Sequence, residues 1–206
     1  MIEDRPSPPA ADADTEGEVM VVDAGGGALA VVRGGRLQRL LSLDESLLLS
    51  IRRFRRPWRT AIARTLTAIG DARSWTAIGL ALCATGTTRG LHLGLRLGAA
   101  ATFATVLSQG LKRSLTRARP DTAIAGFEAL ASNPDRFSFP SGHSAAAFAI
   151  SVAFAGEPYG AGPITCLLAT GISLSRVYLG AHYPLDVAAG AALGVFGGLA
   201  ARILVP

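Results

Sequence analysis

The stretch that decides the fold is Pro140-Ser141-Gly142-His143-Ser144, which leads directly into the apolar run 145–150. A serine immediately before an apolar run is typical of a helix N-cap, so a helix is predicted to begin here. Free backbone N–H groups and the positive end of the helix dipole make such a start suitable for an anion. Gly142 lets the backbone approach a ligand closely, and His143 adds a titratable group. Taken alone, the stretch fits equally well an ordinary capped helix that carries a histidine.

The composition is that of a membrane protein. Half of the 206 residues are hydrophobic and 17% are charged, a balance that suits a membrane protein better than a soluble one. Residues 1–19 carry a formal net charge of −5, so the remainder carries +10. The basic residues flank apolar segments, which favours lipid headgroups or a phosphorylated substrate over nucleic acid as the partner.

The chain is predicted to have two parts, an acidic and mostly disordered tail over residues 1–39 and a membrane domain over residues 40–206. Residues 1–18 are rich in proline, alanine and acidic residues, which indicates disorder. They lack the basic start and apolar centre of a signal peptide. Residues 19–36 show no clear period, so a short hairpin and a disordered stretch are equally compatible with them.

Apolar segments predict an all-α fold, a polytopic membrane helical bundle of five or six spans. Residues 58–71 are the doubtful sixth span, because Arg64 interrupts them. Residues 40–54 carry apolar side chains at helical spacing, with Arg52 and Arg53 on the other face and more arginines following, which predicts a basic helix at the membrane interface. Cys83 and Cys166 lie inside apolar runs and are predicted to be core residues. The five clearest spans are Trp75–Gly86, Leu91–Leu111, Ala145–Ala155, Ile164–Leu179 and Leu185–Val205.

Two further stretches place polar chemistry at the ends of apolar segments. Residues 112–119 hold four cations in eight positions, which by itself fits the basic flank of a span. Arg176 lies near the end of an apolar helix, where an unpaired cation is costly. Pro184 predicts a helix start, so Asp186 falls in its first turn and can reach back to fix the tautomer of His182. Alone, such an aspartate is also explained by the helix dipole.

Taken together, the three stretches resemble the three-part signature of the type 2 phosphatidic acid phosphatase superfamily. The matching motifs are Lys112-x6-Arg119-Pro120, Pro140-Ser141-Gly142-His143 and Ser175-Arg176-x5-His182-x3-Asp186. The resemblance extends from about Leu41 to the C-terminus, and no signature position departs from the pattern. That family includes lipid phosphate phosphatases, undecaprenyl-diphosphate phosphatases, glucose-6-phosphatase and the vanadium haloperoxidases. The resemblance therefore implies a helical core of the phosphatase/haloperoxidase type.

The resemblance also implies a role for each signature residue. His182 would attack phosphorus and form a phosphohistidine, Asp186 would orient it, and His143 would protonate the leaving oxygen and then activate water. Fixed cations would take the place of a metal, so neither a metal nor a cofactor is expected. Arg113 and Arg117 lie outside the signature and are expected only to attract substrate. The predicted substrate-binding residues are Lys112, Arg119, Ser141, Gly142 and Arg176.

The favoured hypothesis is a metal-independent integral membrane phosphatase acting on a lipid phosphate or prenyl diphosphate. Undecaprenyl diphosphate, phosphatidic acid and phosphatidylglycerophosphate are all compatible substrates, and residues 122–136 are expected to form a lid or headgroup loop. One alternative is a phosphate-lipid transporter or non-catalytic membrane protein that retains the pocket, although it would not need both histidines together with Asp186. Another is a vanadate-dependent haloperoxidase, which the membrane-like composition disfavours. The sequence does not indicate the oligomeric state.

The predicted location is the cell (inner) membrane, which the chain would cross several times. If residues 58–71 only lie on the surface, the pocket shares the side of the arginine cluster at residues 52–59. If they span, that cluster, Arg89, Arg96 and Arg202 all face one side of the bilayer. The positive-inside rule makes that side cytoplasmic, so the site would face the periplasm or the exterior.

Overall fold

The structure is a computed structural model that describes residues 19–23, 29–33, 35–131, 135–158 and 161–205. The chain divides into two compact units, residues 1–43 and residues 44–206. The first unit contains an antiparallel hairpin of β1 (Val19–Asp23) and β2 (Leu29–Arg33). The sequence left a hairpin and a disordered stretch open for residues 19–36, and the structure shows a hairpin there. Residues 1–18, for which disorder is predicted, lie outside the described residues, and the extent of the tail stays a prediction.

The second unit is built from helices, as predicted, wherever the structure describes regular elements in it. Each of the five predicted apolar segments coincides with one helix to within a few residues. Helix α1 begins in the first unit and ends in the second. The helices are α1 (Arg36–Arg52), α2 (Pro57–Ile69), α3 (Ala72–Cys83), α4 (Thr88–Ser114), α5 (Pro120–Ala123), α6 (Gly142–Ala153), α7 (Ala161–Tyr178) and α8 (Pro184–Leu204).

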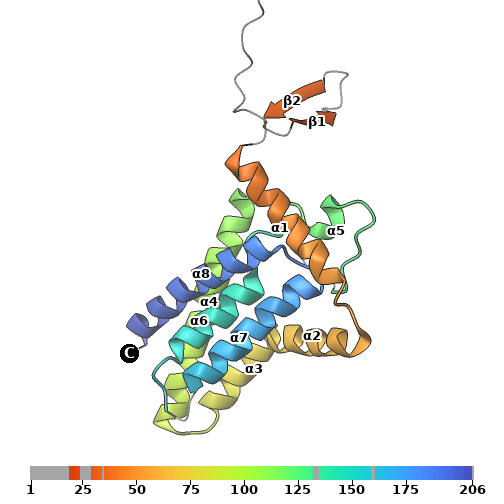
Figure 1. The fold of residues 1–206 in the computed structure, drawn as a ribbon. Helices are drawn as coiled ribbons and strands as arrows, with labels where there is room; N and C mark the ends of the chain where they lie inside the picture. The colour runs from red at the N-terminus through yellow and green to blue at the C-terminus, as the bar shows by residue number, and fades with distance from the viewer. Residues whose placement is uncertain (1–18, 24–28, 34, 132–134, 159–160, 206) are drawn as a thin grey trace, which may run out of the picture. The chain divides into compact units, whose positions relative to one another are not determined.

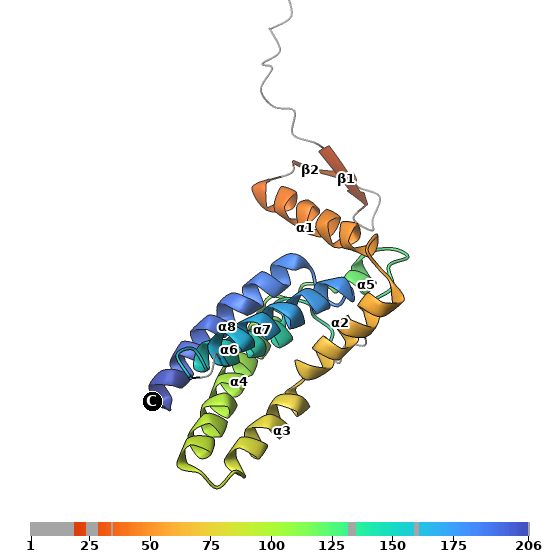
Figure 2. The same ribbon diagram turned by 60° about the horizontal axis from the view of Figure 1, so that its bottom comes forward.

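A stripe of glycines on α8 lets this helix pack closely on α6, and the two helices lie side by side in Figures 1 and 2. Gly190, Gly194 and Gly198 recur every four residues. A Cβ on each of them would collide with a backbone oxygen of α6 or its N-cap, so a larger residue cannot be accommodated without separating the helices. The close packing brings the start of α8 against the start of α6, where the N–H of Ser141 donates to the carbonyl of Asp186 at 2.9 Å.

Helices α2 and α3 together make one bent passage along the bundle (Figures 1 and 2). The N–H of Arg56, just before α2, donates to the hydroxyl of Tyr178 at the end of α7, and Gly70, just after α2, packs against Ile172. Helix α3 then continues along α4. Helix α2 has 13 residues, about 20 Å of helix, whereas the hydrocarbon layer is about 30 Å thick. Helix α2 alone is therefore shorter than this layer, as are α3 and α6 with 12 residues each, and a separate span over residues 58–71 stays a prediction.

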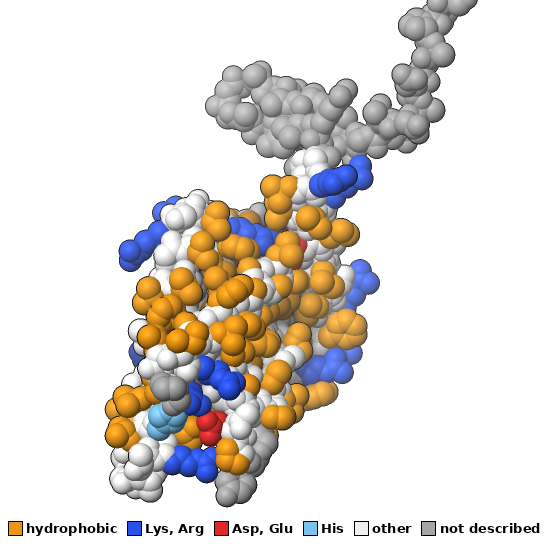
Figure 3. Space-filling view, turned by 90° about the vertical axis from the view of Figure 1, so that its left-hand side faces the viewer, with side chains coloured by type: hydrophobic (Ala, Val, Ile, Leu, Met, Phe, Trp, Pro, Cys, Tyr) orange, Lys and Arg blue, Asp and Glu red, His pale blue; other side chains and the backbone are white. Residues whose placement is uncertain are grey.

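Two helices among the described residues, α4 and α8, are long and apolar enough to cross a membrane on their own. The prediction of five or six spans goes beyond this finding and stays a prediction. Large hydrophobic side chains also point outward, including Leu167, Phe196 and Ile203, which are 76%, 68% and 80% exposed. Figure 3 shows such side chains over the middle of one face of the bundle, with basic side chains towards its two ends.

The outward-facing apolar surface corrects the prediction for the two cysteines. Cys83 is half-buried and Cys166 is exposed on α7, so neither is a fully buried core residue. The prediction was wrong because helices of a membrane bundle are apolar on their lipid-facing side as well. Position within an apolar run therefore does not distinguish the inside of such a bundle from its outside.

Candidate active site

The predicted site residues converge at one end of the bundle. Helix α4 delivers Lys112 near its C-terminal end, α6 delivers His143 in its first turn, and α7 delivers Arg176 near its C-terminal end. His182 lies in the short turn between α7 and α8. Gly180 has φ +75°, and a Cβ there would collide with the ring of Phe127, so glycine permits the sharp exit from α7 that presents His182.

A cavity of about 760 Å³ collects six of the eight predicted site residues on its wall. The other two, Ser141 and Asp186, are fully buried. The hydroxyl oxygen of Ser141 accepts from the N–H of Ser144 at 3.4 Å and from its hydroxyl at 3.1 Å, so it caps α6 as the sequence predicts. A direct contact of Ser141 with substrate stays a prediction. The six residues on the cavity wall are Lys112, Arg119, Gly142, His143, Arg176 and His182.

The imidazole of His182 is directed by Asp186. Its Nδ1 lies 3.6 Å from Oδ2 of Asp186, and the same oxygen accepts from the N–H of Tyr183 at 2.9 Å. The separation of 3.6 Å exceeds a hydrogen bond, and such catalytic contacts often shorten when substrate binds. With Nδ1 turned towards the carboxylate, Nε2 is the nitrogen that remains for a substrate.

Burial is the main cause that lowers the pKa of His182 to about 4. The charges of Arg176 and Arg119 lower this pKa further, while the contact with Asp186 opposes the shift. His182 is therefore a neutral imidazole at neutral pH. A neutral imidazole carries the free lone pair that a nucleophile requires.

Three buried cations surround the two imidazoles. Lys112, Arg119 and Arg176 are each at most 5% exposed. Nη1 of Arg119 donates to the carbonyl of Ala181 at 2.7 Å, which ties this cation to the turn that carries His182. Nη1 of Arg176 donates to the hydroxyl of Thr67 on α2, also at 2.7 Å. These neutral partners help to orient the two guanidinium groups beside the cavity that they line.

Asp135 is a site residue that the sequence motifs do not include. Its carboxylate binds both Lys112 and Arg119, and its carbonyl accepts from Nε of Arg119 at 2.8 Å. Burial alone would raise the pKa of Asp135, but the hydrogen bond and charge of Lys112 together with the charge of Arg119 hold it below its usual range. An ionised carboxylate therefore contacts two of the cations expected to bind phosphoryl oxygens. The only sequence signal was its place in residues 122–136, the predicted lid or headgroup loop.

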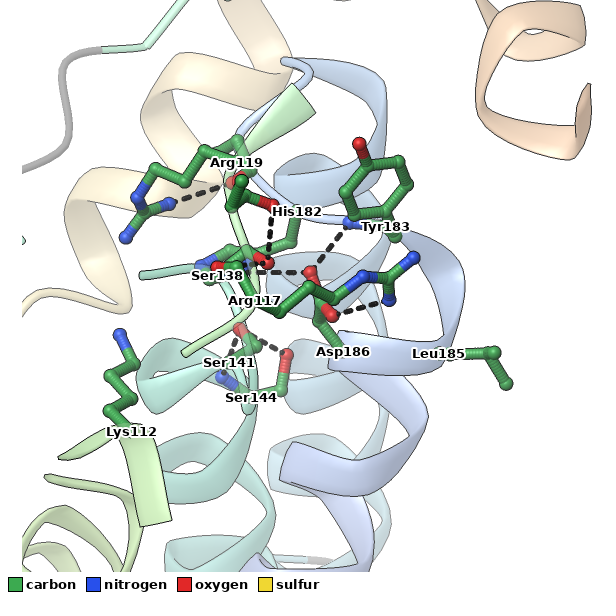
Figure 4. Close-up of polar contacts among 12 residues, drawn as sticks. Lys112, Arg117, Arg119, Ser138, Ser141, Ser144, His182, Tyr183, Leu185 and Asp186 are labelled. Carbon is green, nitrogen blue, oxygen red and sulfur yellow. Dashed lines mark hydrogen bonds and ion pairs between the residues drawn. The ribbon is translucent and has the colours of Figure 1, made fainter. Parts of the chain in front are cut away.

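Arg117 is a second residue whose position the motifs did not reveal, and it contacts Asp186 directly (Figure 4). Its Nη1 donates to Oδ1 of Asp186 at 2.8 Å, and its Nη2 donates to Asp44 at 2.8 Å. The expectation that Arg117 only attracts substrate does not describe this geometry. Asp44 on α1 lies 73 positions away in the sequence, so no local pattern could connect the two.

Comparison with known proteins identifies the family. The family model of the PAP2 superfamily matches residues 93–206, a range that contains all three motifs. The chain belongs to the PAP2 superfamily. A decaprenylphosphoryl-5-phosphoribose phosphatase from Mycobacterium tuberculosis is 36% identical over 140 residues, 68% of this chain and 76% of that protein.

Two solved structures share the fold. A transmembrane PAP2-type phosphatidylglycerolphosphate phosphatase from Bacillus subtilis has a TM-score of 0.65 and 26% identity, covering 81% of this chain and 86% of that one. LpxE from Aquifex aeolicus has a TM-score of 0.66 and 28% identity, covering 77% and 94% respectively. The phosphatase relatives support a hydrolase acting on a phosphate group, and the transmembrane neighbour and the two long apolar helices indicate a membrane protein.

Proposed function

We propose that this PAP2 protein is an integral membrane lipid phosphatase that hydrolyses a phosphomonoester or diphosphate of a lipid through a phosphohistidine on His182. The observation that carries the proposal is the lining of the cavity that holds the site. One part of it holds the two imidazoles and the three cations, and another runs along α3 and α4 over apolar side chains such as Trp75, Leu80 and Val106. A phosphoryl group suits the first part, and a hydrocarbon chain suits the second.

In the first half of the reaction, the lone pair on Nε2 of His182 attacks phosphorus, and the bond from phosphorus to the leaving oxygen breaks. His143 gives a proton to that oxygen. Burial and the charge of Arg176 lower the pKa of His143 to about 3, so the proposal requires the negative charge of the bound phosphoryl group to raise this pKa. Lys112, Arg119 and Arg176 offset the charge that develops on the phosphoryl oxygens. Asp186 stabilises the positive charge that forms on the imidazole of His182.

In the second half, neutral His143 takes a proton from a water molecule while the water oxygen attacks the phosphohistidine. The bond from nitrogen to phosphorus breaks, inorganic phosphate is released, and both histidines return to their starting states. Three fixed cations supply the charge stabilisation that a divalent metal supplies in other phosphatases. Activity is therefore expected to survive EDTA, and vanadate is expected to inhibit.

The proposed location is the inner membrane, and the structure changes the argument for its orientation. The outward-facing site was predicted on the condition that residues 58–71 cross the membrane. That crossing would put the arginines of residues 52–59 and the pocket on opposite sides. Instead, Arg55 donates to the carbonyl of Glu128 and stacks near Phe127, both at the pocket end of the bundle. The positive-inside rule, applied to this arrangement, gives a pocket that faces the cytoplasm. We adopt this orientation in the proposal.

Impermeant thiol labelling in intact cells tests the orientation. Single cysteines would replace Ala125 near the pocket and Thr88 at the other end of the bundle, in a chain with Cys83 and Cys166 changed to serine. All of these positions except the half-buried Cys83 are exposed. Labelling at position 88 but not at position 125 agrees with a cytoplasmic pocket, and the reverse pattern contradicts it.

A substrate panel followed by acid-quench trapping tests the function. The panel comprises decaprenylphosphoryl-5-phosphoribose, undecaprenyl diphosphate, phosphatidic acid and phosphatidylglycerophosphate, each labelled in the scissile phosphate. Hydrolysis of at least one, with an acid-labile and base-stable phosphoenzyme that is absent from His182→Ala, supports the proposal. Binding without hydrolysis would favour the transporter alternative. Activity abolished by EDTA and restored by magnesium would contradict the metal-independent mechanism.

A further inference from the structure

Arg117 links two buried carboxylates from distant parts of the chain. Its Nη1 donates to Oδ1 of Asp186 and its Nη2 to Oδ2 of Asp44, both at 2.8 Å. The side chains of Asp44 and Asp186 are 1% and 0% exposed, and that of Arg117 is 21% exposed. Asp44 lies on α1 and Asp186 in the first turn of α8, whereas Arg117 lies in the segment after α4. A single guanidinium therefore joins three segments beside the nucleophile.

Arg117 is held on several sides. Its guanidinium carbon lies 3.9 Å from the centre of the Tyr183 ring, and its carbonyl accepts from the N–H of Ser138 at 2.9 Å. The second oxygen of Asp44 accepts from the N–H of Leu185 in the first turn of α8 at 2.8 Å. Asp44 thus fixes both Arg117 and the helix start that carries Asp186. Figure 4 shows Arg117 directed at Asp186, on the side away from Lys112.

This arrangement divides the two oxygens of Asp186 between two tasks. Arg117 occupies Oδ1, so Oδ2 is left to accept from Tyr183 and to face Nδ1 of His182. A fully buried carboxylate stays ionised only if cations or hydrogen bonds compensate its lost hydration. Without the guanidinium, Asp186 would lose its charge partner and the contact that fixes the rotation of its carboxylate.

We propose that Arg117 and Asp44 are positioning residues for the nucleophile. They hold Asp186 ionised and rotated so that it directs and polarises His182, and neither touches the substrate. This inference rests on the proposed function, because it assigns the two residues to the step that His182 performs. It replaces the expectation that Arg117 attracts substrate from a distance.

The steady-state test compares Arg117→Gln with Arg113→Gln, which removes an exposed cation from the last turn of α4. We expect Arg117→Gln to lower kcat by about 10- to 100-fold, by analogy with the loss of outer-shell partners of metal-binding histidines. KM and the inhibition constant of vanadate should change less than threefold, because Lys112, Arg119 and Arg176 are intact. If Arg117 only attracted substrate from a distance, both substitutions would instead raise KM and leave kcat unchanged. That result would overturn the inference.

A double-mutant cycle gives the sharper test. If Arg117 acts through Asp186, then Arg117→Gln combined with Asp186→Asn should be no slower than Asp186→Asn alone. Losses that multiply would show that Arg117 acts independently, and would overturn the inference. If Arg117→Gln fails to fold, Asp44→Asn keeps the test available, because asparagine can keep its one acceptor oxygen on the N–H of Leu185 while an NH2 group replaces the charged oxygen that holds Arg117. Asp44→Asn should lower kcat in the same direction and also be non-additive with Asp186→Asn.

The wild-type enzyme separates the two levels of the proposal. A wild type without phosphoenzyme or turnover on any lipid phosphate overturns the proposed function and this inference with it. An active wild type with multiplying losses overturns only the positioning role of Arg117 and Asp44.

Discussion

Two carboxylates border the candidate active site, and their surroundings differ in a way that divides the site into two halves. Asp186 is fully buried at a helix start, with Arg117 on one oxygen and the N–H of Tyr183 on the other. Asp135 lies in a loop, and its side chain is 30% exposed while it binds Lys112 and Arg119. We call the first group, with His182 and Asp44, the nucleophile half, and the second group, with Arg176, the cation half.

The difference indicates different duties. Every carboxylate oxygen of the nucleophile half already has a partner from the protein, which is the condition for a fixed geometry. In the cation half, by contrast, Asp135 binds Lys112 and Arg119, which are proposed to hold the phosphoryl group. Under that proposal, Asp135 competes with substrate for the two cations. The nucleophile half should therefore govern kcat, and the cation half should govern affinity for phosphate and its analogues.

The largest expected effect is in the nucleophile half. His182→Ala should lower kcat by at least about 10⁴-fold, because it removes the atom that attacks phosphorus. Vanadate should still bind, since the cation half remains. The measurement is single-turnover hydrolysis of the best substrate of the panel, with vanadate protection against thermal unfolding as the control for a folded site. If His182→Ala retained turnover, the nucleophile half would not govern kcat, and the proposed difference between the two halves would be wrong.

His143 lies on the cavity wall. The loss of activity that follows its removal should depend on the leaving group. His143→Ala should slow hydrolysis by about 10²- to 10³-fold for an alcohol leaving group, which needs a proton. The loss should be smaller for a lipid aryl phosphate, whose phenolate leaves without one. The ratio of the two losses is the measurement, and an equal loss with both substrates would contradict the role of His143 as an acid.

Most of the helices were predictable from the sequence, because apolar runs bounded by glycine, proline and charge determine where a membrane helix begins and ends. The N-cap at Ser141 and the helix start at Pro184 were local signals and were confirmed. The bend between α2 and α3 was not predictable from the sequence. It depends on the hydrogen bond from Arg56 to Tyr178 and on the packing of Gly70 against Ile172, and the residues of each pair are more than 100 positions apart.

The candidate site shows the same limit. Residues that the family resemblance implies for substrate contact recur as short motifs, so Lys112, Arg176 and His182 could be predicted from the sequence. Residues that hold those groups, such as Asp44 and Asp135, have no motif, because any carboxylate that reaches the right cation will serve. Long-range pairing of this kind becomes visible only when the helices are placed in space.

The acid dependence of the nucleophile half follows from the lowered pKa of His182. The pKa of histidine is 6.5 in an unfolded chain and about 4 in this site. Between these values the unfolded chain binds a proton that the folded protein does not, so stability falls as the pH falls from 6.5 to about 4. Above 6.5 this group adds no pH dependence. Thermal melts of the wild type and His182→Gln over this range measure the effect, and the variant should be less sensitive to acid.

Activity should follow the same ionisation. After correction for the titration of the substrate, kcat/KM should fall about tenfold per pH unit below the pKa of His182, because the protonated imidazole has no lone pair to attack phosphorus. A corrected acid limb near pH 6.5 would mean that His182 is not held neutral by burial.

The smallest expected effect tests the cation half. Asp135→Asn removes the negative charge that competes with phosphate but keeps the size of the side chain. If substrate must displace Asp135, the fraction of protein ready to bind rises when the charge is lost, and apparent affinity rises in proportion. We expect KM and the inhibition constant of vanadate to fall by about 3- to 10-fold, with kcat nearly unchanged. Asp121→Asn, an exposed acid of α5, is the matched control for the loss of one negative charge nearby. A lower kcat with unchanged vanadate inhibition would instead place Asp135 among the groups that act during the reaction, and the two carboxylates would then belong to one functional unit.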